Sequence, residues 1–147
     1  MTITTEITPD TIVYTARATS TGGRSGRATS DDGILDLALT APKETGGPGT
    51  GTNPEQLFAA GYSACFQGAL GLVAKKQGVD TSGSLVTAEV GFGPEGESFA
   101  LAVTMRVVVP GVDLDVVQQI ADAAHQVCPY SKATRGNVPV TVVAVAA

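Results

Sequence analysis

The chain has 147 residues, 9 basic and 14 acidic side chains, and is 43% apolar but only 16% charged. Its length allows one buried core, and its composition excludes an intrinsically disordered protein. The net charge of −5 and the lack of a basic run argue against nucleic acid or an anionic membrane as a partner. Residues 1–10 resemble no signal peptide, and no apolar stretch approaches the roughly 20 residues of a membrane span. We therefore expect a single cytoplasmic domain over residues 1–147.

The N-terminal third predicts three antiparallel strands and then an irregular loop. The strand-like segments are rich in Thr, Ala and Val or alternate in polarity: Val13–Ala18, Arg27–Ser30 and Ile34–Thr40. A glycine-rich stretch, Thr21–Gly26, separates the first two, and an Asp-Asp-Gly turn at 31–33 precedes the third. Residues 42–52 contain too many Gly and Pro residues for regular structure, so they predict a loop.

The next segment predicts a long helix that is apolar on all sides. Asn53 is a good N-cap, Pro54 suits the first helical position, and Gln56 completes a capping box. Apolar residues then cover every face until Lys75, and Gly78 ends the helix. The helix contains three glycines: Gly61, Gly68 and Gly71. Because each costs about 1 kcal/mol relative to Ala, we expect another backbone to pack closely there, as where the helix crosses a second copy of itself.

The C-terminal half predicts a hairpin, a helix and a last strand. Leu85–Phe92 and Phe99–Val109 alternate in polarity, a helix follows from Asp113 until Pro129, and Val138–Val145 is rich in Val. The order βββ-α-ββ-α-β predicts an α+β fold with antiparallel sheets around a long central helix. Since only 5% of the residues are aromatic, we expect oligomerisation to add buried surface.

The two cysteines, Cys65 and Cys128, are the first candidates for chemistry. A structural disulfide is not expected in an acidic cytoplasmic chain. Cys65 lies within the apolar helix, which is typical either of a core residue or of a buried reactive thiol. Cys128 ends a helix just before Pro129, where we expect a partly exposed thiol that can move. One mobile and one buried thiol fit an attacking and resolving pair.

A reactive thiolate at Cys65 needs a positive charge from outside its own helix, because the dipole of the N-terminus fades within a turn. Arg24 lies in a glycine-rich loop that could project it inward, although the local sequence alone favours an exposed hairpin tip. Arg27 is a rival, but it opens a strand and is expected on a sheet face. A buried Arg needs a carboxylate partner. Glu55, in the first helical turn, is either that partner or a surface acid favoured by the dipole.

Other kinds of site fit the sequence poorly. His125 and Cys128 are three residues apart, but zinc takes four ligands, or three plus water. With one His, two Cys and no CxxC pair, we expect neither a metal site nor a thioredoxin-like centre. No GxSxG motif supports a hydrolase, and the Gly22–Gly26 stretch opens no helix, so it does not predict a phosphate site.

Three motifs connect the chain with a known family: TGGRSGRA (Thr21–Ala28), TNPEQLFAAGYSACF (Thr52–Phe66) and HQVCPYSKATRGN (His125–Asn137). They resemble the organic hydroperoxide resistance proteins, the Ohr branch of the OsmC/Ohr superfamily. The resemblance covers about residues 13–145, and CPYS followed by ATRGN favours this branch over the osmotically induced one. One departure is Lys132, where many members have Asn; it adds a charge near Cys128.

The resemblance implies an intertwined homodimer that acts as a cysteine peroxidase on fatty-acid and other alkyl hydroperoxides and releases alcohols. Residue by residue, it implies that Cys65 attacks the peroxide and that Cys128 resolves the sulfenate as an intrachain disulfide. Arg24 matches the arginine that activates the thiolate, and Glu55 matches its carboxylate partner. No residue is assigned to substrate binding.

The resemblance also implies that the enzyme holds no cofactor and is recycled by dihydrolipoyl groups, on a lipoylated protein or as dihydrolipoamide, and not by thioredoxin. Two alternatives stay open. One is a peroxidase of the osmotically inducible sister group, with another peroxide preference. The other is a non-catalytic lipid- or lipoyl-binding module whose cysteines are incidental.

The spacing of Glu55 and Cys65 predicts which subunit supplies which residue. Ten helical residues separate them by about 15 Å along the axis and by some 80° around it. One Arg24 side chain cannot touch both on a straight helix. We therefore expect two helices to cross in a two-fold dimer, so that the Arg24–Glu55 pair of one chain serves the cysteines of the other. A break in the helix would allow all these residues to act within one chain.

Overall fold

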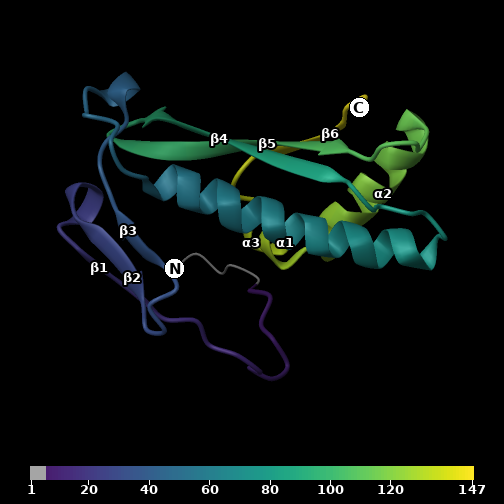
Figure 1. Ribbon diagram of the computed structural model, residues 1–147, viewed down its shortest axis with the longest axis horizontal. Coiled ribbons are helices and arrows are strands. Elements are labelled where there is room, and N and C mark those ends of the chain that lie inside the picture. Colours follow the sequence, from purple (N-terminus) through teal and green to yellow (C-terminus); the bar gives the residue numbers. More distant parts are fainter. Residues whose placement is uncertain (1–5) are drawn as a thin grey trace. The chain divides into compact units, whose positions relative to one another are not determined.

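The computed structural model describes residues 6–147 (Figure 1). It contains two compact units, Met1–Pro54 and Glu55–Ala147, and each is described by itself. Each unit contains one three-stranded sheet. A single domain over 1–147 stays a prediction. The predicted lack of a leader rests partly on residues 1–5, which lie outside the described residues.

The first unit is an antiparallel sheet with two short 3-10 turns. Its strands, in sheet order, are β1 (Ala18–Thr21), β2 (Arg27–Ser30) and β3 (Asp36–Ala38), and its turns are η1 (Gly23–Ser25) and η2 (Lys43–Thr45). The predicted strand at 27–30 is confirmed. The first strand instead begins at Ala18, because its pairing stops where Ala18 meets Ser30, the last residue of β2.

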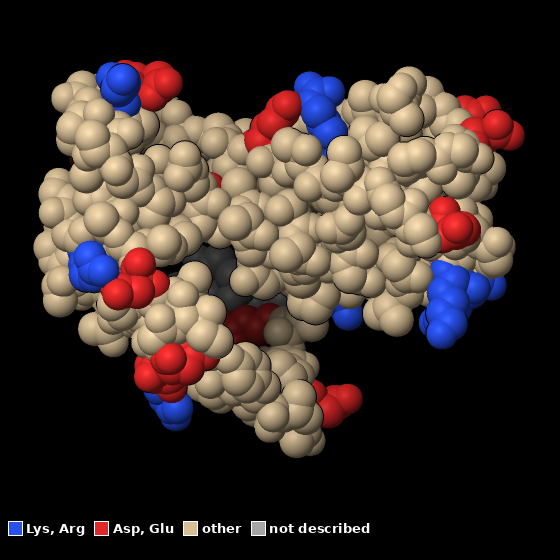
Figure 2. All heavy atoms as spheres, viewed as in Figure 1, with Lys and Arg blue, Asp and Glu red and all other residues tan. Residues whose placement is uncertain are grey.

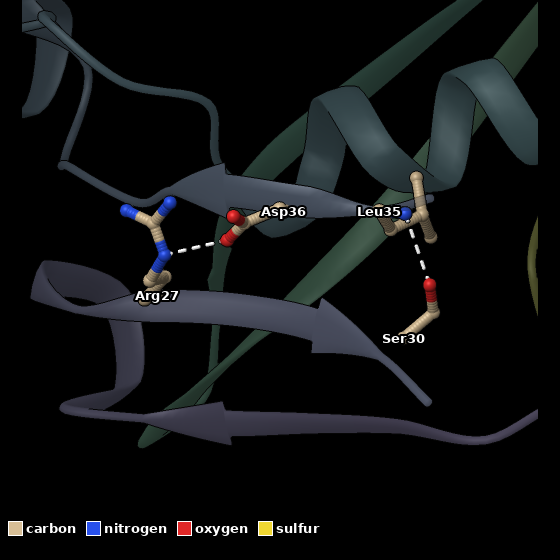
Figure 3. Close-up of polar contacts among 4 residues, drawn as sticks. All are labelled: Arg27, Ser30, Leu35 and Asp36. Carbon is tan, nitrogen blue, oxygen red and sulfur yellow. Dashed lines mark hydrogen bonds and ion pairs between the residues drawn. The ribbon is translucent and has the colours of Figure 1, made fainter. Parts of the chain in front are cut away.

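The third strand is also shorter than predicted. Leu35 belongs to the turn, where its N–H donates to the hydroxyl of Ser30 at 2.9 Å (Figure 3). Asp32 accepts hydrogen bonds from the Ser30 hydroxyl and the Ile34 N–H, and these bonds lower the pKa of the Asp32 carboxyl. Side chain to backbone bonds of this kind compete with a sheet ladder, so the strand begins only at Asp36.

The second unit combines a long helix with a second sheet. Its elements are α1 (Pro54–Lys76), β4 (Leu85–Glu95), β5 (Ser98–Val108), α2 (Leu114–Val127), α3 (Pro129–Thr134) and β6 (Val140–Ala144). The predicted bounds of the long helix are confirmed, and it is unbroken from Pro54 to Lys76. Figure 1 shows α1 running along the β4-β5-β6 sheet, with α2 and α3 close by.

Two features of this unit differ from the prediction. The strand β6 pairs with β5 in parallel, not antiparallel, because α2 and α3 carry the chain back along the sheet before β6 begins. Pro129 ends α2, as predicted, but it also occupies the first position of a further helix, α3. Proline suits that position because the first N–H of a helix has no partner within it.

The core of the second unit lies between one face of β5 and the helices α1 and α2. Alternate residues of β5 are buried, as expected for a sheet with one covered face. The largest fully buried side chains of this core come from all three elements: Tyr62, Phe66, Leu70, Met105, Val107, Val117 and Ile120. These residues anchor α1 and α2 and so position both cysteine-bearing segments.

Much of α1 is apolar but not covered by the described residues. By length and composition, α1 could cross a membrane, although the apolar stretches of the sequence predicted no membrane span. The core helix of a soluble protein can have the same length and composition. Only 28% of the apolar stretch of α1 is buried, and Leu72 is 66% exposed. Within the described residues, a Cβ at Gly68 or Gly71 would meet nothing within 4 Å.

Within the described residues, no backbone packs on the glycines of α1, so the predicted close packing stays a prediction for a second copy of the helix. At Gly61 the close neighbour is a side chain: a Cβ there would lie 3.3 Å from the ring of Tyr130. Gly68 and Gly71 stay open to a second chain.

On the face seen in Figure 2, charged side chains of both signs are scattered over a mostly uncharged surface.

Candidate active site

The two cysteines lie side by side in the second unit. Their sulfur atoms are 3.5 Å apart, and both are free thiols. Cys65 lies in the middle of α1, whereas Cys128 is the residue that joins α2 to α3, with an extended backbone. A disulfide has sulfur atoms about 2.0 Å apart, so about 1.5 Å of approach would join them.

The exposure of the two thiols is the reverse of the prediction. Cys128 is fully buried, and Cys65 is only partly buried. The reason is helical spacing, since Cys128 follows Ile120 and Ala124 on the buried face of α2, four residues apart. The α3 helix begins directly after it. Of the two cysteines, Cys65 is the one with exposed surface.

The environment of Cys65 in this unit opposes ionisation. Burial raises the pKa of its thiol, and the neighbouring Cys128 thiol raises it further. A hydrogen bond from the backbone N–H of Tyr130 acts in the opposite direction but does not prevail. A thiolate at neutral pH therefore requires a positive charge beyond these groups.

The two charged residues predicted for the site fall in different units. Arg24 lies in η1, between β1 and β2 of the first unit, and Glu55 lies in the first turn of α1. The turn around Arg24 depends on glycine: Gly22 and Gly23 have positive φ, and a Cβ at Gly26 would lie 1.6 Å from the Thr21 carbonyl oxygen. That Arg24 meets Glu55 and Cys65 stays a prediction.

Arg27, the rival arginine, lies on the sheet of the first unit as predicted. Its Nε donates to the Asp36 carboxylate at 2.6 Å across β2 and β3 (Figure 3). This hydrogen bond lowers the pKa of Asp36 and raises that of Arg27. Both side chains are about half exposed, so Arg27 serves the sheet surface.

Sequence reasoning missed a group of buried polar residues that surrounds the cysteine-bearing segments. Tyr62 lies one helical turn before Cys65 on α1, and its hydroxyl is 2.9 Å from that of Ser131 and 3.1 Å from that of Thr134. The Ser131 hydroxyl is also 2.8 Å from Nδ1 of His125. The available signal was a Tyr on an apolar helix, because a buried phenol needs a hydrogen-bond partner.

His125 favours its neutral form in this setting. Burial lowers the pKa of its imidazole, and the positive charge of Arg135 lowers it further, while Asp122 opposes both. The guanidinium of Arg135 donates to the backbone carbonyl of His125 at 2.6 Å. Over residues 6–147, no group of three or more His, Cys, Asp and Glu side chains could hold a metal ion.

Comparison with known proteins agrees with this architecture. Residues 47–143 match the OsmC-like protein family. The chain is 52% identical to an organic hydroperoxide resistance protein of Xanthomonas axonopodis pv. citri, over 91% of this chain and 96% of that protein.

Two solved structures share the fold. The organic hydroperoxide resistance protein of Elizabethkingia anophelis is 46% identical, with a TM-score of 0.85 over 92% of this chain and 99% of that one. OhrB of Bacillus subtilis is 45% identical, with a TM-score of 0.83 over 91% of this chain and all of that one. These matches confirm the predicted α+β fold, and the described residues form two sheets and, with the unpredicted α3, three α-helices. The chain belongs to the OsmC family and to its Ohr, or organic hydroperoxide resistance, branch.

Proposed function

We propose that this protein is a cysteine peroxidase that reduces organic hydroperoxides to alcohols. The observation that carries the proposal is the pair of free thiols 3.5 Å apart, one partly exposed and one buried. The organic hydroperoxide resistance proteins among its relatives support a role in hydroperoxide detoxification.

The chemistry proceeds in two steps. The Cys65 thiolate attacks the distal oxygen of the hydroperoxide, so that an S–O bond forms and the O–O bond breaks. The leaving alkoxide takes up a proton and departs as the alcohol. The Cys128 sulfur then attacks the sulfenic acid at Cys65, which gives a disulfide, and the hydroxyl leaves with the thiol proton as water.

The raised pKa of Cys65 supports a role for Arg24. Because burial disfavours the thiolate, a guanidinium beside the sulfur would restore it and would stabilise the charge that develops on the leaving oxygen. Glu55 would hold the planar guanidinium in one orientation through paired hydrogen bonds.

The surroundings of Cys65 favour an alkyl hydroperoxide over hydrogen peroxide. Cys65 packs against the apolar core of the second unit, as does Phe58 two turns earlier on α1. An alkyl or fatty-acid chain gains about 25 cal/mol for each Å² of apolar surface it buries. Hydrogen peroxide has no such surface to bury.

A slender dithiol suits the recycling step. In the oxidised enzyme the bridge would join a partly exposed sulfur to a buried one, so a reductant must attack at Cys65. Dihydrolipoyl groups present two thiols on a thin chain and leave as a cyclic disulfide, which returns both cysteines to thiols. We propose this class of reductant for a cytoplasmic enzyme without a bound cofactor.

The proposed function predicts rapid, selective loss of both thiols. One equivalent of cumene hydroperoxide, mixed with reduced protein in a stopped-flow instrument, should consume two thiols per chain far faster than hydrogen peroxide does. Dihydrolipoamide should restore the thiols and thioredoxin should not. Slow thiol loss, equal to that of the urea-unfolded chain, would support a non-catalytic lipid- or lipoyl-binding module. Faster reaction with hydrogen peroxide than with cumene hydroperoxide would support the other alternative, a peroxidase of the osmotically inducible sister group.

We further propose a homodimer in which each active site draws on both chains. The uncovered apolar surface of α1 and the open Gly68 and Gly71 suit close packing of a second copy. Because α1 is continuous, Glu55 and Cys65 lie about 15 Å apart along one axis. The broken helix that would bring them together is absent from residues 54–76. The Arg24–Glu55 pair would therefore serve the partner's cysteines.

Mixed dimers test this arrangement. A heterodimer of Cys65→Ser and Arg24→Ala chains should regain one intact site, and so about half the activity of the wild-type dimer. The matched heterodimer pairs a wild-type chain with a Cys65→Ser/Arg24→Ala chain and should be inactive. If all residues act within one chain, the heterodimer of Cys65→Ser and Arg24→Ala chains should be inactive. The matched heterodimer should then show about half the activity of the wild-type dimer. Both heterodimers are purified with two affinity tags and assayed with cumene hydroperoxide.

A further inference from the structure

A chain of hydrogen-bonded polar groups connects the two cysteine-bearing segments. It runs from Nδ1 of His125 to the Ser131 hydroxyl (2.8 Å), then to the Tyr62 hydroxyl (2.9 Å), and on to the Thr134 hydroxyl (3.1 Å). The Thr134 hydroxyl ends the chain by donating to the backbone carbonyl of Ser131 at 3.1 Å. Tyr62 and Ser131 are fully buried and Thr134 nearly so, whereas His125 is half-buried. Water therefore does not replace the contacts among the three hydroxyls.

Counting protons gives this chain a direction. It has four contacts and four donors, which are three hydroxyls with one proton each and one imidazole N–H. Since the carbonyl can only accept, the proton of Thr134 goes to it, and Tyr62 must donate to Thr134. Ser131 then donates to Tyr62. Only one direction satisfies all four contacts, and in it His125 donates from Nδ1.

The chain joins the segments on which the two sulfurs depend. Tyr62 precedes Cys65 by three residues, one turn on α1. His125 lies in the last turn of α2, and Ser131 lies in α3, so they flank Cys128 on both sides. The same junction carries Tyr130, whose backbone N–H bonds to the Cys65 sulfur. The polar chain therefore fixes the α2–α3 junction, which carries Cys128, against the part of α1 that carries Cys65.

We propose that His125, Ser131, Tyr62 and Thr134 form a directed positioning network that holds the Cys128 sulfur in place for disulfide formation with Cys65. The inference rests on the proposed peroxidase function, because the step it serves is the attack of Cys128 on the Cys65 sulfenic acid. That step needs only about 1.5 Å of approach. Misplacement by about 1 Å lowers such rates by as much as a hundredfold.

The direction of the network is tested on the reduced protein, without turnover. His125 is the only histidine of the chain, so ¹⁵N NMR of its ring reports one tautomer. The proton should be on Nδ1 in the wild type. In Tyr62→Phe, the Ser131 hydroxyl can turn toward His125, and the proton should move to Nε2. A wild-type proton on Nε2, or no change in Tyr62→Phe, overturns the network as described.

The positioning role is tested by separating the two steps of the reaction. In Tyr62→Phe and Thr134→Val, sulfenic acid should persist about ten times longer or more, and over-oxidation should occur at lower peroxide excess. Thiolate oxidation should slow much less. Thr134→Ser, which keeps the hydroxyl, should behave like the wild type. Ser63→Ala is the matched control, because that neighbouring hydroxyl donates to the Ala60 carbonyl of its own helix.

The outcomes separate the inference from the proposed function. Sulfenic acid is timed by trapping and mass spectrometry after one equivalent of cumene hydroperoxide, and folding is checked by thermal melting. Unchanged sulfenic acid lifetimes in both variants, or equal slowing of both steps, overturns the positioning role. If the wild type itself forms no disulfide, the proposed function fails, while the tautomer measurement still decides the direction of the network.

Discussion

Replacing Cys65 by Ser will abolish hydroperoxide reduction, whereas replacing Cys128 by Ser will leave one turnover intact. The reason is the difference in burial: Cys65 is partly exposed, whereas Cys128 is fully buried. Without Cys128, the sulfenic acid at Cys65 has no thiol 3.5 Å away to condense with. It should persist after one equivalent of peroxide and advance to sulfinic acid in excess.

The measurement combines single-turnover kinetics with mass spectrometry of the oxidised chain. Cys65→Ser should show no fast phase at any alkyl hydroperoxide concentration and no oxygen adduct on Cys128. Cys128→Ser should release one equivalent of alcohol, with the added oxygen on Cys65. Because serine is close to cysteine in size, both variants should fold, and thermal melting checks this. If Cys128→Ser loses the first turnover and Cys65→Ser keeps it, the two roles are exchanged.

Replacing Arg24 by Ala will slow the peroxidase at neutral pH by about a hundredfold or more, the usual effect of losing a charge at a developing oxyanion. Burial already raises the pKa of the Cys65 thiol, and only the Tyr130 N–H opposes this within the second unit. Without the guanidinium the thiol keeps its raised pKa. The thiolate fraction is then small at neutral pH and grows about tenfold per pH unit below that pKa.

The sign of the pH dependence distinguishes this role from a merely structural one. The rate of Arg24→Ala should rise steeply toward alkaline pH and partly recover there, because the thiolate forms without help. Arg27→Ala is the matched control, since Arg27 lies on the same hairpin but pairs with Asp36 on the sheet surface. Arg24→Lys should be intermediate, because it keeps the charge and loses the planar fork. Near-normal rates for Arg24→Ala between about pH 6 and pH 9 would exclude this role.

The sequence by itself determined the elements whose signals are local. The cap at Asn53 and Pro54 and the lysines before Gly78 placed the long helix, which runs from Pro54 to Lys76. Short-range turn chemistry also placed the strand at Arg27–Ser30, and Pro129 correctly ended the second helix. The motifs around Arg24, Cys65 and Cys128 indicated the family, because the chemistry concentrates in short segments of the chain.

Only the tertiary structure decided features that depend on distant partners. The extent of β1 follows from the length of β2, and the parallel pairing of β6 follows from the path of α2 and α3. Neither is encoded in the hydrophobic pattern of the strand itself.

The burial of Cys128 is decided in the same way. Its position in the sequence, just before a proline, predicted a partly exposed thiol, but Cys128 continues the face of α2 that packs into the core with α1 and β5. The hydroxyl network is the clearest case, because Tyr62 and Ser131 are 69 residues apart and meet only when α1 packs against α3. The local sequence therefore specified which residues are candidates for the chemistry. The packing of α1 against the α2–α3 junction placed the two sulfurs within reach of each other and decided which of the two cysteines is buried.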